Sequence, residues 1–319
     1  MIAIELALPA FILGVLLLYK GSDLLVDGTA KTAVRIGVSS LIISVILVGF
    51  GTSAPEFAIS VGAAIQKNSD ISLGNILGSC VANLLLVLGV ASIIRPIKIN
   101  KGIISREFPI MLGATFVLLL SSYLGFLDEY HVIGGFLFLI LFSLFIYFFY
   151  CCAKKERINN KKYKDGKLSK NLLFVFLGII GVVAGAWLLI DSSVSIAEFF
   201  GIPTFIIAVS MVAVGTSIPE LVVSAMASYK NESDIAIGNV LGSNVFNILM
   251  ILGVAALFIP LNANVLESFA HLWILLIVTL VMFPIVLTGK TITRFEGVIM
   301  LVIYSLFIWY TFFGYKIII

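Results

Sequence analysis

"GTSAPE" (residues 51–56) returns as "GTSIPE" (residues 215–220), an offset of 164 residues (215 − 51). The likeness extends far beyond the six residues, because residues 21–97 align with 185–261 without a gap and 33 of the 77 aligned positions are identical. Chance does not produce such a match, so the chain is an internal duplication.

The composition indicates a protein that lies in lipid. Of the 319 residues, 61% are hydrophobic and 12% are charged, and the mean hydropathy is +1.18. A water-soluble protein could not cover so much apolar side chain. About 20 apolar residues span a bilayer core, and ten such stretches are predicted, near residues 3–27, 38–65, 73–95, 107–126, 131–152, 171–197, 203–228, 237–259, 268–288 and 295–314.

The duplication and the spans together predict the architecture. We expect an all-α integral membrane protein made of a five-helix repeat (1–152), a basic linker (153–170) and a second five-helix repeat (171–319). Because five is odd, the second copy enters the membrane from the opposite side. Two inverted repeats with helices broken at the midplane are a recurring plan of secondary transporters, whose substrate site lies between the repeats.

The distribution of basic residues predicts the orientation. The linker holds eight of the twenty Lys and Arg residues, and an excess of these residues marks the cytoplasmic side. We therefore expect a multi-pass protein of the cell membrane with a cytoplasmic linker and both termini outside. The same asymmetry explains the net charge of +3, so a nucleic-acid partner is not predicted.

The repeated motif combines a helix breaker with a charge. Pro55 has no N–H, which frees the carbonyl four residues earlier, and such carbonyls are tolerated in a membrane where they line a cavity. Thr52, Ser53 and Glu56 add two hydroxyls and a carboxylate. The second copy supplies the same groups from Thr216, Ser217 and Glu220.

The next span of each repeat adds a polar face. "SDISLGNILGSCVAN" (69–83) returns as "SDIAIGNVLGSNVFN" (233–247). In each copy a serine and an asparagine four residues apart share one side of a helix, and glycines let the backbones approach closely. The pairs are Ser79 with Asn83 and Ser243 with Asn247, and the glycines are Gly74, Gly78, Gly238 and Gly242.

The donor set favours a hard cation. Carboxylate, hydroxyl, amide and carbonyl oxygens suit Ca²⁺ and Na⁺, whereas soft metals prefer sulfur or imidazole. Two buried carboxylates need compensation, which one divalent cation or several monovalent cations would give. A hydrolase built on Ser53 or Ser217 is not favoured, because neither motif holds a His or Lys to activate a serine, so no enzyme activity is predicted.

Other acidic residues receive more ordinary interpretations. Asp27 and its counterpart Asp191 are read as interfacial, and Asp70 and Asp234 as helix N-caps. Asp23 has Trp187 as its counterpart and so breaks the symmetry of the repeats.

At these residues the sequence resembles the sodium/calcium exchanger family, within the cation/calcium exchanger superfamily. The paired motifs and "GNILGSCVAN" with "GNVLGSNVFN" resemble its two repeats. The resemblance implies that Glu56 and Glu220 bind Ca²⁺ together with the carbonyls of Thr52 and Thr216. It further implies that the side chains of Ser53, Ser217, Ser79 and Ser243 and the carbonyls of Gly49 and Ala213 face flanking Na⁺ sites.

The resemblance also implies a function. It predicts Na⁺-for-Ca²⁺ antiport by alternating access, with Ca²⁺ and Na⁺ as transported substrates. The sequence points to no cofactor and to no obligate protein partner, and it is compatible with a monomer. Potassium-dependent members carry Asp where Asn247 stands, so Asn83 and Asn247 favour potassium-independent exchange. H⁺/Ca²⁺ antiport remains the alternative, since two protons also neutralise two glutamates.

Overall fold

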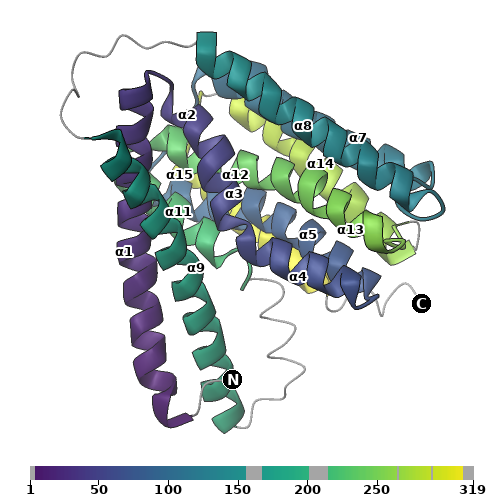
Figure 1. Cartoon of the computed structure of the whole chain (residues 1–319), viewed down its shortest axis with the longest axis horizontal. Coiled ribbons are helices and arrows are strands. Elements are labelled where there is room, and N and C mark those ends of the chain that lie inside the picture. Colours follow the sequence, from purple (N-terminus) through teal and green to yellow (C-terminus); the bar gives the residue numbers. More distant parts are fainter. Residues whose placement is uncertain (1–3, 156–166, 201–214, 264–265, 289, 312–319) are drawn as a thin grey trace.

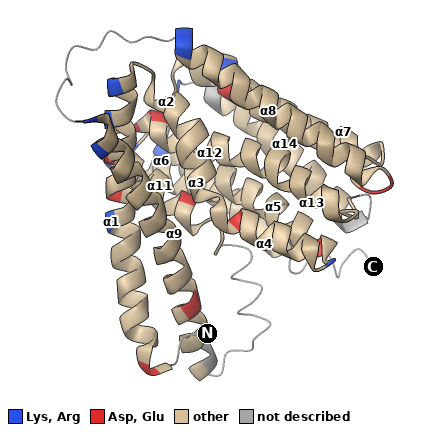
Figure 2. Cartoon of the chain, viewed as in Figure 1, with Lys and Arg blue, Asp and Glu red and all other residues tan. Residues whose placement is uncertain are grey.

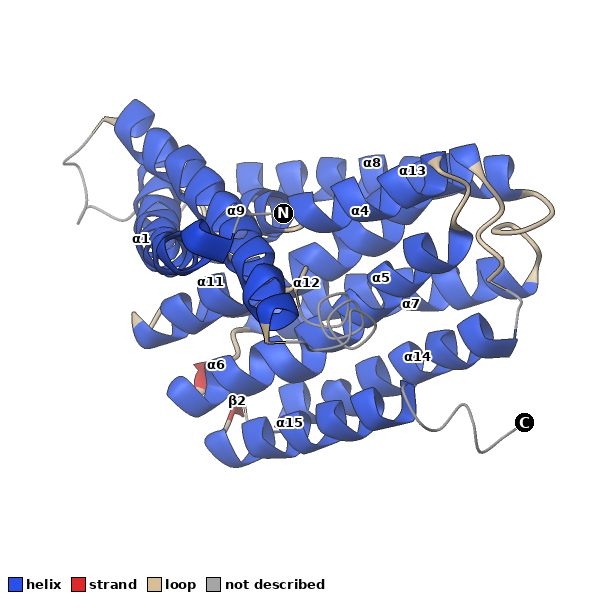
Figure 3. Ribbon diagram, turned by 90° about the horizontal axis from the view of Figure 1, so that it is seen from below, coloured by secondary structure: helices blue, strands red, loops and turns tan. Residues whose placement is uncertain are grey.

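The computed structural model of the chain is almost entirely helical (Figures 1 and 3). It describes all residues except 1–3, 156–166, 201–214, 264–265, 289 and 312–319. Two short strands, β1 (Ile97–Lys98) and β2 (Thr291–Ile292), pair antiparallel and join the two halves of the chain at one end.

The described helices divide between the first and the second half of the sequence. Those of the first half are α1 (Ile4–Ile36), α2 (Ser40–Ile43), η1 (Ser44–Val48), α3 (Gly49–Thr52), α4 (Ala54–Ile65), α5 (Ser69–Ala82), η2 (Asn83–Val87), α6 (Leu88–Ile94), η3 (Ile103–Glu107), α7 (Phe108–Tyr123) and α8 (His131–Lys155). Those of the second half are α9 (Leu168–Phe199), α11 (Ile218–Tyr229), α12 (Ser233–Val245), η4 (Phe246–Ile251), α13 (Leu252–Phe258), α14 (Leu266–Thr288) and α15 (Arg294–Trp309).

Among the described residues, seven continuous helical stretches are long and apolar enough to cross a membrane. An eighth candidate is the pair Ser40–Thr52 and Ala54–Ile65, which is bent by 49° at its break. Among the ten predicted spans, residues 203–228 fall partly outside the described residues, and α15 has 16 described residues. The structure therefore gives an all-helical multi-span protein, and the number ten stays a prediction.

The breaks at the two motifs have the same backbone conformation. Ser53 has φ −81° and ψ 12°, and Ser217 has φ −86° and ψ 7°. In each case proline stands in the first turn of the helix that follows, where its missing N–H would have no helical partner anyway. The predicted helix interruption is confirmed at the first motif. At the second motif α11 begins directly after Ser217, and the residues before Gly215 lie outside the described residues.

α5–α6 and α12–α13 form the centre of the molecule (Figure 1). In their apolar windows 78% and 83% of the residues are buried, against 22% in α1 and 28% in α8. The outer helices expose large apolar side chains along much of their length, as helices facing lipid do.

α1 and α9 lie side by side and run antiparallel (Figure 1). A Cβ added at Gly14, Gly21 or Gly28 would meet the α9 backbone near residues 185–189, 178–182 and 171–175 respectively. Small residues every seventh position let two helix backbones approach this closely.

π-helical turns interrupt the two central helices at corresponding places. η2 begins at Asn83, and η4 contains Asn247, which is 164 residues later. Such i→i+5 turns occur often at functional sites. The sequence analysis does not predict them.

Two local expectations are revised. The N-cap of α5 is Asn68, whose side chain accepts a hydrogen bond from Ile71 N at 3.1 Å, so Asp70 lies inside the first turn and is not the N-cap. Asp234, in the first turn of α12, accepts a hydrogen bond from Asn100 at 2.6 Å.

Of the glycines expected at close contacts, Gly238 and Gly242 meet the backbone of residues 41–45. No described atom lies within 4 Å of a Cβ built at Gly74 or Gly78, whose expected partners, 205–209, lie outside the described residues.

Candidate functional site

The two motif glutamates lie in the first turns of α4 and α11 and are fully buried. Each accepts a hydrogen bond from the serine 23 residues further along its own repeat. Ser79 donates to Glu56 Oε1 at 3.1 Å, and Ser243 donates to Glu220 Oε1 at 3.4 Å. The repeats therefore build the same carboxylate–hydroxyl pair twice.

A second repeated pair lies on the same helices. Asn75 donates to Ser60 at 2.9 Å, and Asn239 donates to Ser224 at 2.9 Å. These amides face the hydroxyls of the opposite motif, since Thr52 donates to Asn239 Oδ1 at 3.0 Å and Thr216 donates to Asn75 Oδ1 at 3.3 Å. The polar groups of one repeat are thus hydrogen-bonded to those of the other.

Further contacts between the repeats surround the carboxylates. Ser53 donates to Glu220 Oε1 at 3.1 Å, and Ser217 donates to the Ser79 hydroxyl at 3.2 Å. The Gly49 carbonyl lies 3.2 Å from the Ser243 hydroxyl and is an alternative acceptor for its proton. Each glutamate therefore belongs to a hydrogen-bonded network that contains residues of both repeats.

Four buried oxygens in this region have no hydrogen-bond partner among the described residues. They are Glu56 Oε2, Glu220 Oε2, Asn83 Oδ1 and Asn247 Oδ1. An unpaired buried acceptor costs about 1–3 kcal/mol, and more when it is charged. Two come from the carboxylates and two from amides, and hard oxygens of this kind are the ligands of Ca²⁺.

Eleven of the twelve predicted site residues are described, and all eleven are buried. Ala213 lies outside the described residues. One network joins Glu56, Ser79, Ser217 and Asn247, and a second joins Glu220, Ser53, Ser243, Thr52 and Gly49. Thr216 bonds Asn75, and Asn83 donates to Asn244 Oδ1 at 3.0 Å.

Asn75 and Asn239 are polar residues of this region that the sequence analysis missed. A signal for them was present, because Asn75, Ser79 and Asn83 are spaced by four and share one helix face. Their counterparts Asn239, Ser243 and Asn247 have the same spacing.

The comparison with known proteins accounts for this arrangement. The model of the family described as "Sodium/calcium exchanger protein" matches residues 6–151 and 170–313. The chain belongs to the sodium/calcium exchanger family. Sodium/calcium exchangers are transporters and not enzymes.

Individual relatives of this exchanger-family chain are similar over nearly their full length. The sodium/calcium exchanger MaX1 of Methanosarcina acetivorans is 32% identical over 335 residues, covering 93% of this chain and 96% of the relative. The inner membrane protein YrbG of Escherichia coli is 30% identical, covering 86% and 87%. A structure of the sodium–calcium exchanger NCX_Mj soaked with Na⁺ and Ca²⁺ superposes with a TM-score of 0.81 at 32% identity, covering 94% and 97%.

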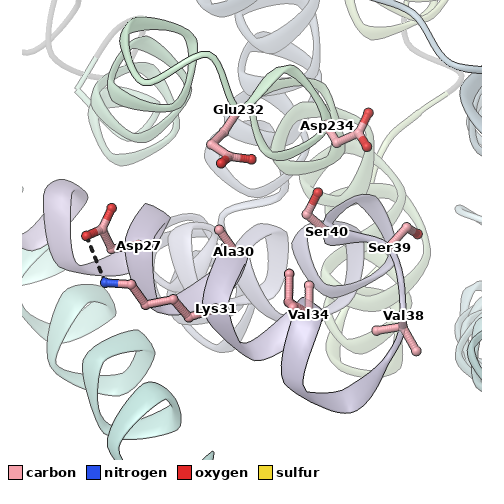
Figure 4. A pocket seen from close by; sticks show the side chains of 10 residues that line it. Asp27, Ala30, Lys31, Val34, Val38, Ser39, Ser40, Glu232 and Asp234 are labelled. Atoms are coloured by element: carbon pink, nitrogen blue, oxygen red, sulfur yellow. Dashed lines mark hydrogen bonds and ion pairs between the residues drawn. The ribbon is translucent and has the colours of Figure 1, made fainter. Parts of the chain in front are cut away.

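An acidic cavity of about 370 Å³ opens near the start of α2 and α12 of this exchanger-family chain (Figure 4). Its polar lining includes Asp27, Ser40, Glu232 and Asp234. Burial, followed by the nearby charges of Asp234 and Asp27, raises the pKa of Glu232. Further along α12 toward Ser243, the helix packs directly against the backbone of residues 41–45.

Lys230, in the turn between α11 and α12, connects that turn to α1. Its Nζ lies 2.5 Å from Asp23 Oδ1 and 2.6 Å from Asp27 Oδ1. Burial lowers the pKa of Lys230, but hydrogen bonds from Lys230 to the two aspartates outweigh this and raise it overall. Asp23, whose counterpart in the other repeat is Trp187 rather than an acidic residue, therefore takes part in an ion pair.

A second cavity, of about 540 Å³, borders the second motif. It is lined by residues of α9, including Trp187 and Asp191, and by Pro55, Gly215 and Thr216. The lining places α9 beside both motifs of this exchanger-family chain.

Proposed function

We propose that this protein exchanges Na⁺ for Ca²⁺ across the membrane by alternating access at a single buried site. The observation that carries the proposal is the pair of fully buried glutamates, one from each repeat, each with one carboxylate oxygen unpaired. Two such charges cost several kcal/mol in a membrane interior unless a counter-charge is present. A bound cation supplies that counter-charge, so the site favours an occupied state.

Charge balance explains why the exchange is coupled. One Ca²⁺ neutralises Glu56 and Glu220, and so do two Na⁺ ions. A carrier that reorients only when these charges are compensated must move one kind of cation for the other. The proposed ligands are the twelve predicted site residues. Among them, Asn83 and Asn247 would contribute amide oxygens in addition to the two carboxylates.

We extend the proposal to the topology. Ten spans in two inverted halves, 1–152 and 171–319, are supported by the antiparallel packing of the corresponding helices α1 and α9. Lys and Arg gather at the ends of α1, α8 and α9 that flank the linker (Figure 2), which supports a cytoplasmic linker and outer termini in the cell membrane.

Potassium independence is part of the proposal. Both amide positions carry asparagine, Asn83 and Asn247, so the site has two carboxylates rather than three. A smaller negative charge calls for fewer positive charges in each transport cycle, which argues against a co-transported K⁺.

Flux measurements with each gradient applied separately test the coupling ion. Purified protein in liposomes should take up Ca²⁺ when Na⁺ is higher inside, with the pH gradient collapsed and K⁺ absent. Uptake that needs only a pH gradient would identify the alternative, H⁺/Ca²⁺ antiport, and would reject the proposal. Uptake that requires K⁺ would reject its potassium-independent form.

A further inference from the structure

The amide groups of Asn83 and Asn247 can help a cation only if their oxygens, not their nitrogens, face it. The two ends of an amide have nearly the same shape but opposite hydrogen-bonding character. Resting on the proposed function, we propose that Asn244 is a positioning residue that orients the Asn83 amide so that its oxygen faces the cation site.

The orientation of Asn244 is fixed by acceptors that cannot exchange roles. Asn244 Nδ2 lies 3.2 Å from the backbone carbonyl oxygen of Cys80 and 3.7 Å from the thioether sulfur of Met111. Both atoms only accept hydrogen bonds. The nitrogen of Asn244 must therefore lie on this side, and its Oδ1 on the other.

That oxygen in turn determines the orientation of Asn83. Asn83 Nδ2 donates to Asn244 Oδ1 at 3.0 Å. With its nitrogen held there, Asn83 turns its Oδ1 the other way, where it is buried and has no hydrogen-bond partner among the described residues. The chain of contacts begins at a backbone carbonyl, so it does not depend on which ion is bound.

The amide of Asn247 is oriented by a different contact. Its Nδ2 donates to the Ser79 hydroxyl at 3.3 Å, and that hydroxyl donates to Glu56 at 3.1 Å. The single hydroxyl proton of Ser79 goes to the carboxylate, so Asn247 must present its nitrogen to Ser79. Its orientation therefore depends on Glu56, whereas that of Asn83 depends on Asn244.

The two repeats differ at the residue that makes this possible. The counterpart of Asn244 in the first repeat is Cys80 (244 − 164 = 80). A thiol is a weak donor and a weak acceptor, so it cannot hold an amide as firmly. Asn244 is also buried against α5, and a purely structural role for it must be separated from a positioning role.

A double-mutant cycle makes that separation. Asn244→Leu keeps the approximate size of the side chain and removes the acceptor for Asn83. In an Asn83→Asp background the orientation no longer matters, because a carboxylate presents an oxygen either way. Equilibrium binding of radioactive Ca²⁺ to the purified full-length protein is measured for all four combinations, together with the thermal unfolding of each.

We expect Asn244→Leu to weaken Ca²⁺ binding about tenfold when Asn83 is present, the upper end of what one neutral hydrogen bond contributes. In the Asn83→Asp background the change should stay within about twofold. Equal losses in both backgrounds would show a structural role and overturn the inference, as would an unchanged Kd in the Asn83 background.

A second variant covers the case in which Asn244→Leu fails to fold. Asn244→Cys carries the residue that the first repeat has at this position, and it should weaken binding in the same direction and depend on Asn83 in the same way. A Kd that does not change in this variant would overturn the inference while leaving the proposed function standing. A wild-type protein that binds no Ca²⁺ would instead reject the proposed function itself.

Discussion

In Glu56 and Glu220, the protein provides hydrogen bonds to only one of the two carboxylate oxygens. In each carboxylate Oε1 accepts a serine hydroxyl, and Oε2 has no hydrogen-bond partner among the described residues. A fully paired carboxylate would be a structural ion, and a wholly unpaired one would be prohibitively costly. The observed state, with one oxygen held and one left over, suits a group that binds a passing cation.

Replacing either glutamate with glutamine should abolish transport. Glu56→Gln or Glu220→Gln keeps the shape and the serine contact but removes the charge, so we expect Ca²⁺ flux to fall by about a hundredfold or more. The measurement is radioactive Ca²⁺ uptake into proteoliposomes. Glu129→Gln, at an exposed glutamate before α8, is the matched control and should transport normally; wild-type flux in either site variant would refute the assignment.

Individual site residues were predictable from the sequence to the extent that duplication marks them. Glu56, Ser79 and Asn83 stand out because each recurs 164 residues later. Asn75 recurs as well, but its role depends on a contact with Thr216, 141 residues away, which spacing alone does not reveal. The orientation of the Asn83 amide depends on Asn244, whose counterpart is a cysteine, so symmetry gave no indication of it.

α12 is positioned by a glycine that has no room for a side chain. A Cβ at Gly242 would collide with the Val45 carbonyl oxygen and would lie 2.8 Å from Val45 C. These are backbone atoms, which cannot rotate away, so α12 or η1 would have to move. Ser243, whose hydroxyl lies within hydrogen-bond distance of both Glu220 and the Gly49 carbonyl, is the next residue in the chain.

Gly242→Ala should therefore separate α12 from η1 and disturb the site. We expect a loss of about 1–3 kcal/mol in stability from overpacking and a larger fractional loss of Ca²⁺ binding than of folded protein. Thermal unfolding with and without Ca²⁺ measures both. Gly113→Ala is the control, since an added Cβ there meets no described atom within 4 Å, and equal behaviour of the two variants would contradict the account.

The contact of Lys230 with α1 is an element-scale feature that no local pattern predicts, because its partners lie 203 and 207 residues away. The π-helical turns η2 and η4 are similar in this respect. In a uniformly apolar helix a shift from i→i+4 to i→i+5 bonding leaves no trace in the hydrophobic pattern. Helix breaks at proline, by contrast, follow from covalent structure and were predicted.

Removing the lysine should loosen α1 beside the α11–α12 turn. In Lys230→Met we expect faster amide hydrogen exchange in residues 21–31, measured by mass spectrometry. Because the pKa of Lys230 is raised, the ion pair is fully present below the ordinary lysine pKa and is lost only as pH rises through the raised value. The effect should therefore be the same at about pH 6.5 and about pH 8.5.

A control for this prediction is Lys101→Met, at an exposed lysine expected on the same side of the membrane. It should leave exchange in α1 unchanged. Unaltered exchange in Lys230→Met, or a similar change in the control, would contradict a role for the ion pair in holding α1.

At the scale of the whole molecule, the fold class was predictable from the sequence, while the ten spans and the inverted repeats stay predictions. An all-helical membrane protein follows from composition, and family membership agrees with the motifs. Helix packing was harder to predict. In the approach of α1 to α9, Gly14 lies against Gly185, and Gly21 lies against Gly178 and Gly181, whereas Gly28 lies against the backbone of residues 171–175. A glycine in lipid has many possible partners.

The proposed orientation can be tested with α8, which runs from His131 to Lys155. Its 25 residues span about 37 Å, so its ends should lie on opposite sides of the membrane. In a protein with Cys151 and Cys152 changed to serine, an impermeant maleimide should label Glu129→Cys in intact cells and Lys155→Cys only after lysis. Labelling in the reverse pattern would invert the topology.

The central claim is that Na⁺ and Ca²⁺ use one site in turn, and simultaneous measurement of both fluxes tests it most directly. Proteoliposomes loaded with radioactive Na⁺, with no pH gradient and no K⁺, are diluted into buffer with or without Ca²⁺. The account predicts that external Ca²⁺ triggers Na⁺ efflux together with Ca²⁺ uptake, and that Glu56→Gln abolishes both together. Ca²⁺ uptake without Na⁺ efflux, or loss of only one flux in Glu56→Gln, would contradict it.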